Sequence, residues 1–98
     1  MTSKQRAYLK GLAMNIDPCL NVGKDGYTPA ITEAVQEAIE KNELIKIGIL
    51  KNCADDPREV AAMIADRTHS EVVQVIGKKI VLYKQAKKEE NRKIVLPK

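Results

Sequence analysis

The sequence of 98 residues contains no tryptophan and no phenylalanine, and its aromatic side chains are three tyrosines and one histidine. Domains that bind single-stranded nucleic acid by stacking bases, such as the RNA recognition motif, need aromatic side chains on an exposed sheet. The shortage of aromatic residues therefore excludes a broad stacking surface. Tyr27, which lies beside a loop containing two glycines, is the one aromatic residue expected close to a candidate site.

Patterns for metal ligands, disulfides and membrane spans are also missing. Cys19 and Cys53 lie 34 residues apart without a CxxC motif, and the single histidine, His69, is distant from both. These spacings predict two buried free thiols, with no metal site, no cofactor and no structural disulfide. No apolar run approaches the ~20 residues of a membrane-spanning helix, and no signal-peptide pattern is present, so we expect a cytoplasmic protein without a membrane partner.

The net charge of +4 is unevenly distributed along the chain. Residues 1–24 carry a net charge of +3, residues 25–76 carry −5, and residues 77–98 carry +6. Basic ends around an acidic middle indicate a surface with two electrostatically different sides. One of these sides is suited to a polyanionic partner.

Capping residues, apolar spacing and turn glycines predict the order helix, strand, helix, strand, helix, strand, strand. The strands are expected at residues 19–22, 43–50, 72–76 and 80–83. Helical connections make the first three strands candidates for parallel pairing, and Gly77-Lys78 predicts a tight type II′ hairpin between the last two. The predicted fold is a two-layer α/β domain with a mixed four-stranded sheet over residues 1–84.

The two ends of the chain carry most of its basic side chains. The first helix is expected to run from Thr2 to the Asp17-Pro18 pair, with Arg6 and Lys10 on a stripe that faces away from the core. Residues 85–98 are expected to form a basic tail, solvated or partly mobile. Its apolar stretch, residues 94–97, can dock on the domain or add an edge strand.

The stretch from Val22 to Pro29 is the candidate binding site. Gly23 and Gly26 allow a tight turn with backbone N–H groups facing outward, and Lys24 lies between them. Thr28 can cap the following helix, whose N-terminus offers further N–H groups to a phosphate. An ordinary strand-to-helix loop explains the same residues, and the segment alone favours that interpretation.

The chain resembles a known family at four places in the same order and spacing. These are the first helix, the glycine loop, the start of the central strand and the last hairpin, in the sequences TSKQRAYLKGLA (2–13), VGKDG (22–26), ELIK (43–46), and VQVIGK with IVLY (73–78 and 80–83). The resemblance is to the CRM domain, named for chloroplast RNA splicing and ribosome maturation, and to its bacterial stand-alone form, the YhbY family. It covers residues 2–84.

The resemblance implies a fold similar to the C-terminal domain of translation initiation factor three, and an RNA-binding function through a G-x-x-G loop and a basic first helix. It also implies association with precursors of the large ribosomal subunit, hence with rRNA. Asp25 departs from the family pattern, in which a small residue is usual. The expected RNA-binding residues, which add nearby basic side chains to the matched positions, are Lys4, Arg6, Lys10, Gly23, Lys24, Asp25, Gly26, Tyr27, Lys78 and Lys79.

Two alternatives remain open. A duplex-DNA-binding protein of the Alba type has a similar fold. An enzyme that acts on a phosphate-bearing small molecule is the other alternative, but the loop is neither G-x-x-x-x-G-K-[ST] nor G-x-G-x-x-G and has no acid–base pair beside it. We therefore expect a monomeric protein that is not an enzyme and has no small-molecule substrate.

Overall fold

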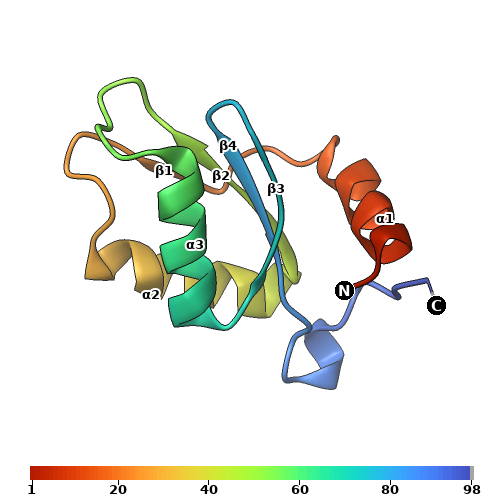
Figure 1. The fold of residues 1–98 in the computed structure, drawn as a ribbon. Coiled ribbons are helices and arrows are strands. Elements are labelled where there is room, and N and C mark those ends of the chain that lie inside the picture. Colours follow the sequence, from red (N-terminus) through yellow and green to blue (C-terminus); the bar gives the residue numbers. More distant parts are fainter. Residues whose placement is uncertain (98) are drawn as a thin grey trace.

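Residues 1–97 are described by the computed structural model, in which helices and strands alternate in the predicted order (Figure 1). The three α-helices begin after the predicted capping residues Thr2, Thr28 and Asp56, whose side chains each accept a hydrogen bond from a backbone N–H group of the first turn. The elements are α1 (Ser3–Ala13), β1 (Leu20–Val22), α2 (Pro29–Asn42), β2 (Leu44–Ile49), α3 (Pro57–Thr68), β3 (Glu71–Ile76), β4 (Lys79–Tyr83) and the short 3-10 helix η1 (Glu89–Asn91).

The four strands form one mixed sheet in the order β1-β2-β4-β3. β1 pairs with β2 in parallel, and β4 pairs antiparallel with both β2 and β3. The predicted mixed sheet and hairpin are therefore confirmed, and Gly77 has the positive φ that a type II′ turn needs at its first central position. The predicted parallel pairing of the third strand is wrong: β3 runs in the same direction as β2, but β4 lies between them.

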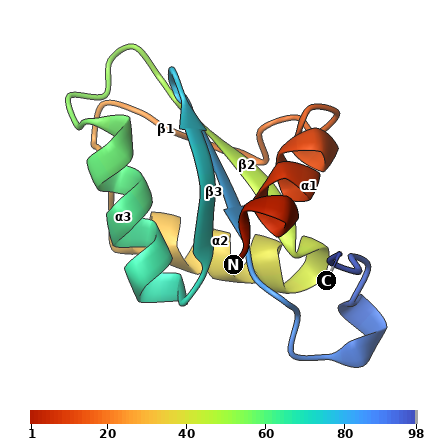
Figure 2. The same ribbon diagram turned by 45° about the vertical axis from the view of Figure 1, so that its right-hand side comes forward.

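Helices cover both faces of the sheet (Figure 2). α2 and α3 pack on one face around Val35, Ile39 and Ile64, against the three isoleucines of β2. α1 packs on the opposite face, where Leu9 and Ala13 contact a second cluster. The prediction of two layers is thus corrected to helix, sheet and helix, because the sheet also buries apolar residues on the α1 side, namely Leu44, Val73, Val81 and Tyr83.

Arg6 occupies a different position from the one predicted. Its guanidinium Nη1 donates hydrogen bonds to the backbone oxygens of Val72 and Val73, the latter at 2.9 Å, and the side chain is half-buried. The expected exposed stripe on α1 is therefore wrong for Arg6, which joins α1 to β3. Lys4 and Lys10 are exposed.

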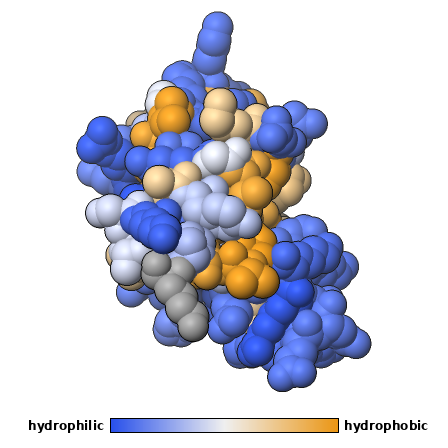
Figure 3. Space-filling view, turned by 90° about the vertical axis from the view of Figure 1, so that its right-hand side faces the viewer, coloured by the Kyte–Doolittle hydropathy of each residue, from blue (hydrophilic) through white to orange (hydrophobic). Residues whose placement is uncertain are grey.

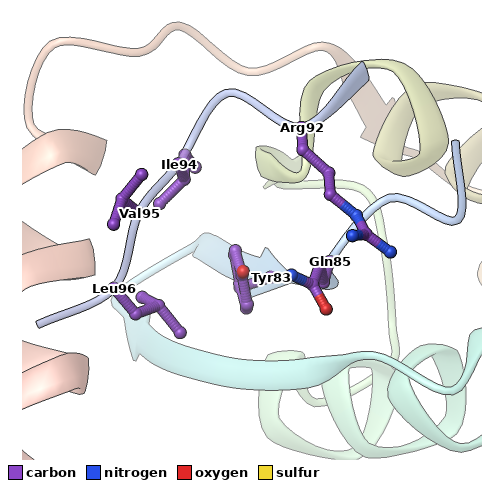
Figure 4. A pocket seen from close by; sticks show the side chains of 6 residues that line it. All are labelled: Tyr83, Gln85, Arg92, Ile94, Val95 and Leu96. Atoms are coloured by element: carbon purple, nitrogen blue, oxygen red, sulfur yellow. The ribbon is translucent and has the colours of Figure 1, made fainter. Parts of the chain in front are cut away.

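The C-terminal segment, residues 84–97, brings Ile94, Val95 and Leu96 to the same pocket as Tyr83 (Figure 4). Backbone N–H groups of this segment bond to Glu43. The Glu43 side chain is fully buried, and its carboxylate accepts hydrogen bonds from the N–H groups of Ala86 at 2.9 Å, Lys93 at 2.5 Å and Ile94 at 3.0 Å. Ile94 and Leu96 pack against the α1-side cluster, so the apolar stretch docks and adds no strand.

Glu43 also has an unusual backbone. It ends α2 with a φ of 63°, a conformation that side-chain-bearing residues seldom adopt, and its own N–H and C=O groups bond Ile39 and Lys84. Burial alone raises the pKa of its carboxyl. The N–H donors of Ala86, Ile94 and Lys93 and the Arg92 guanidinium outweigh burial, so that the pKa lies below its ordinary value.

The outer side formed by α1 and the C-terminal segment carries mostly hydrophilic side chains, with hydrophobic ones gathered between them (Figure 3). The predicted burial of both cysteines is wrong: Cys19 is exposed and Cys53 is half-buried, and both are free thiols. Within residues 1–97, no helix combines the length and apolarity needed to cross a membrane.

Candidate functional site

Three loops meet at one end of the sheet (Figure 1). The glycine loop follows β1, residues 50–56 follow β2, and the Gly77-Lys78 turn precedes β4. Two hydrogen bonds join them: Leu50 N–H donates to Val22 O at 2.9 Å, and Ile49 N–H donates to Lys78 O at 2.7 Å. Parallel pairing of β1 with β2 and antiparallel pairing of β2 with β4 thus bring separate segments of the chain together.

The glycine loop is a tight turn closed by a hydrogen bond from Gly26 N–H to Gly23 O at 2.9 Å. Gly26 has a φ of +67°, and a Cβ built there would lie 2.4 Å from Oδ2 of Asp55. The positive φ favours glycine at Gly26, whereas the exposed Asp55 side chain could move away from a Cβ. A Cβ on Gly23 would meet only ordinary contacts, so the fold does not account for glycine at that position.

The backbone N–H groups of the loop divide into two sets. Gly26 N–H is used by the turn, and Tyr27 N–H donates to Oδ2 of Asp55 at 3.4 Å. Within residues 1–97, the N–H groups of Lys24 and Asp25 have no protein acceptor. Lys24 thus offers both an ammonium group and a free backbone donor, whereas the Asp55 carboxylate already occupies the last donor of the loop.

Tyr27 is held by packing. Its hydroxyl is hydrogen-bonded to Oγ1 of Thr32, and Cζ of Arg67 lies 5.2 Å from the centre of its ring. The ring also packs against the core on the α2 and α3 side. These contacts explain Tyr27 structurally, and the cation on one ring face leaves less of it for a base.

Three exposed lysines lie at this end of the sheet, one on each loop. Lys24 is in the glycine loop, Lys51 is in the turn that follows β2, and Lys78 is in the hairpin turn. Lys79 begins β4 opposite Gly48, and its Nζ would be 3.6 Å from a Cβ placed on Gly48. We call Lys24, Lys51, Lys78 and Lys79 the lysine edge. Lys78 and Lys79 therefore lie at the end of the sheet that carries the glycine loop.

The first helix is only partly brought to this end. Arg6 bonds the first residues of β3, and Gln5 donates to Pro97 O at 3.1 Å, so the start of α1, with Lys4, lies at the opposite end of the sheet. Lys10 is in the last turn of α1, nearer the lysine edge. The structure therefore separates Lys4 and Arg6 from the other predicted site residues.

The part of the chain that carries these features matches a known family. The family model described as the CRS1 / YhbY (CRM) domain matches residues 1–84, the part that holds the sheet, the three α-helices and the glycine loop. The chain belongs to the CRM domain family. The resemblance seen in the sequence is thereby confirmed.

Three relatives show how far the likeness to CRM proteins extends. The Bacillus subtilis protein named Probable RNA-binding protein YqeI is 40% identical over 97 residues, 99% of each chain. A Haemophilus influenzae protein named RNA-binding protein is 31% identical, with 99% of this chain and 95% of its own length covered. A solved Staphylococcus aureus structure, described as that of a candidate RNA binding protein, is 40% identical, has a TM-score of 0.80 and is covered over 99% of both chains.

Lys51 is the one residue of the lysine edge that was not predicted from the sequence to bind RNA. It follows a strand just as Lys24 does, and parallel pairing of those two strands places their ends together. The pairing was predicted, so the signal was present in the sequence. Within the described chain, no group of three or more histidine, cysteine, aspartate or glutamate side chains is placed to hold a metal ion.

Proposed function

We propose that this protein binds structured RNA through its glycine loop and lysine edge, and that it associates with precursors of the large ribosomal subunit in the cytoplasm. The observation that carries the proposal is the meeting of Gly23–Gly26, Lys51 and the hairpin lysines at one end of the sheet. The relatives named as RNA-binding proteins support RNA as the polyanion. No catalytic step is part of the proposal.

The mechanism is backbone recognition. Gly23 has no side chain between the loop and an approaching phosphate, and the N–H groups of Lys24 and Asp25 are available as donors. The lysine ammonium groups neutralise neighbouring phosphates, and the counterions released on binding make the affinity depend on salt. Because the site reads backbone and shape, we expect double-stranded or folded RNA to bind with little sequence preference.

The difference in charge between α1 and α2 supports RNA binding on the α1 side of the sheet. α1 carries three basic residues and no acidic one. α2, on the opposite face of the sheet, carries three glutamates and one lysine. The uneven charge along the sequence therefore becomes a difference between the two faces, which orients a polyanion toward the α1 side.

Replacing Asp55 with alanine is expected to strengthen RNA binding. The Asp55 carboxylate is bonded to Tyr27 N–H and competes with a phosphate for the loop. Its removal frees one donor and deletes one negative charge, which together are expected to raise the affinity at low salt roughly fivefold. Fluorescence anisotropy with a labelled RNA hairpin measures this change.

Asp25→Ala is the matched control, since it deletes the same charge from the glycine loop itself without touching the hydrogen bond of Tyr27 N–H to Asp55. We expect a smaller gain from Asp25→Ala than from Asp55→Ala. Equal gains would show that charge alone acts and that the Asp55 carboxylate does not compete for the loop.

Association with ribosomal precursors is tested by sedimentation of cell lysate through a sucrose gradient. The proposal expects the protein to travel with particles smaller than the mature large subunit, and to leave them when Lys24 is replaced by alanine. Preferential binding of the purified protein to duplex DNA over structured RNA would favour the Alba-type alternative and contradict the proposal.

A further inference from the structure

A hollow of about 170 Å³ lies on the sheet face that α1 only partly covers. Val81 of β4 forms its floor, with Lys46 and Gln74 paired on either side of Val81 in the neighbouring strands. Ala13, the last residue of α1, and Met14, which caps this helix, make one wall, and Ile76 and Lys79 make another. No residue of the glycine loop lines the hollow.

The walls of the hollow are apolar and accessible. Met14 is 81% exposed and Ile76 is 60% exposed, although both are large hydrophobic side chains. Val81 and Ala13 beneath them are each 1% exposed. Water-facing apolar walls above a dry floor are typical of a site that another molecule covers.

A β-bulge places an amide in this hollow. The register between β3 and β4 shifts between Val72 and Gln74, so that Val73 and Gln74 both lie on the α1 side of the sheet. Val73 is buried under α1, whereas the Gln74 amide lines the hollow and makes no hydrogen bond within residues 1–97. Bulges commonly redirect a side chain toward a functional surface in this way.

The hollow is electrostatically continuous with the lysine edge. Lys79 belongs to both, and Lys46 adds a second ammonium group to the rim. No acidic residue lines it. Gly48 adds no side chain beside Lys79, and the exposed carboxamide of Asn21, its partner in β1, lies over it. A polyanion bound at the lysine edge can therefore continue across this face.

We infer that the hollow receives one unpaired nucleobase of the RNA, and this inference rests on the proposed function. Met14 and Ile76 contact the base faces, the Gln74 amide bonds donors and acceptors on the base edge, and Lys46 and Lys79 bind the adjoining phosphates. Aliphatic walls here take the place of the aromatic residues that the sequence lacks. RNA containing a bulged nucleotide would accordingly be preferred over an uninterrupted helix.

The test compares an RNA hairpin that carries one unpaired adenine in its stem with the same hairpin fully paired. Wild-type protein is expected to bind the bulged hairpin about tenfold more tightly, and Met14→Gln/Ile76→Ser to lose most of that preference while keeping its affinity for the paired hairpin. Met63→Gln is the matched control, because Met63 is 37% exposed on α3, across the sheet.

A second readout is the NMR signal of the Met14 methyl group, which a stacked base shifts upfield. Equal affinity for both hairpins, with binding that still depends on Lys24, would overturn the base site and leave the proposed function intact. Absence of RNA binding altogether would overturn both. A preference retained in the double variant would also overturn the assignment and leave the apolar walls to a protein partner.

Discussion

Glu43→Ala is expected to lower the free energy of unfolding by about 3–5 kcal/mol, because it removes the acceptor of three backbone N–H groups beneath the C-terminal segment. The loss is limited by release of residues 84–97, since the freed N–H groups can then bond water. Urea denaturation measures the change, and hydrogen exchange at Ala86, Lys93 and Ile94 is expected to accelerate.

Glu37→Ala is the control for this substitution. Glu37 is exposed on the same helix, α2, and a surface replacement of this kind is expected to change stability by no more than ~0.5 kcal/mol. Glu43→Gln, which keeps the shape and one acceptor oxygen, should fall between wild type and Glu43→Ala. Similar stabilities for Glu43→Ala and Glu37→Ala would contradict the role assigned to the buried carboxylate.

Acid provides an independent readout of the same group. The native pKa of Glu43 lies below its ordinary value, so the unfolded chain binds the proton more readily than the folded one. The stabilisation is therefore complete above the ordinary glutamate pKa of about 4.3 and is lost as the pH falls through the lower native pKa. In Glu43→Gln this part of the acid dependence should disappear.

The fold was predictable where local rules act alone. Thr2, Thr28 and Asp56 cap helices as their side chains and spacing indicate, and the alternation of Ile45, Ile47 and Ile49 identifies the central strand. The strand order was not predictable in full. Whether β3 or β4 lies next to β2 depends on which strand buries both of its faces, and the Val73–Gln74 bulge obscures the alternation of β3.

Long-range hydrogen bonds explain two side-chain positions that the sequence did not predict. The sequence places Arg6 correctly on the first helix. No neighbouring residue in the sequence indicates that its guanidinium donates hydrogen bonds to two carbonyl groups of β3. In the sequence, Glu43 looks like an ordinary charged residue just before a strand. Only in the folded chain do residues 86–94 lie over its carboxylate. Lys24 and Lys78 were found because loops at strand ends can be located from sequence alone.

The lysine edge is expected to supply much of the salt dependence of RNA binding. Each lysine that neutralises a phosphate contributes ~0.7–0.9 to the slope of log affinity against log salt, so Lys24→Ala/Lys51→Ala/Lys78→Ala should lower the slope by roughly 2–2.7. Between 50 and 200 mM salt, that difference corresponds to about a 30-fold smaller loss of affinity than in wild type. Affinity at the lower salt concentration falls correspondingly, while stability changes little because all three side chains are exposed.

A second triple variant, Lys41→Ala/Lys87→Ala/Lys88→Ala, separates position from net charge. It removes the same three charges from exposed lysines at the end of α2 and after β4, the end of the sheet opposite the glycine loop. If the RNA backbone binds at the lysine edge, this variant keeps nearly the wild-type slope. Equal slopes in the two variants would mean that RNA responds to the overall charge of the protein, and that the meeting of three loops at one end of the sheet does not create the binding site.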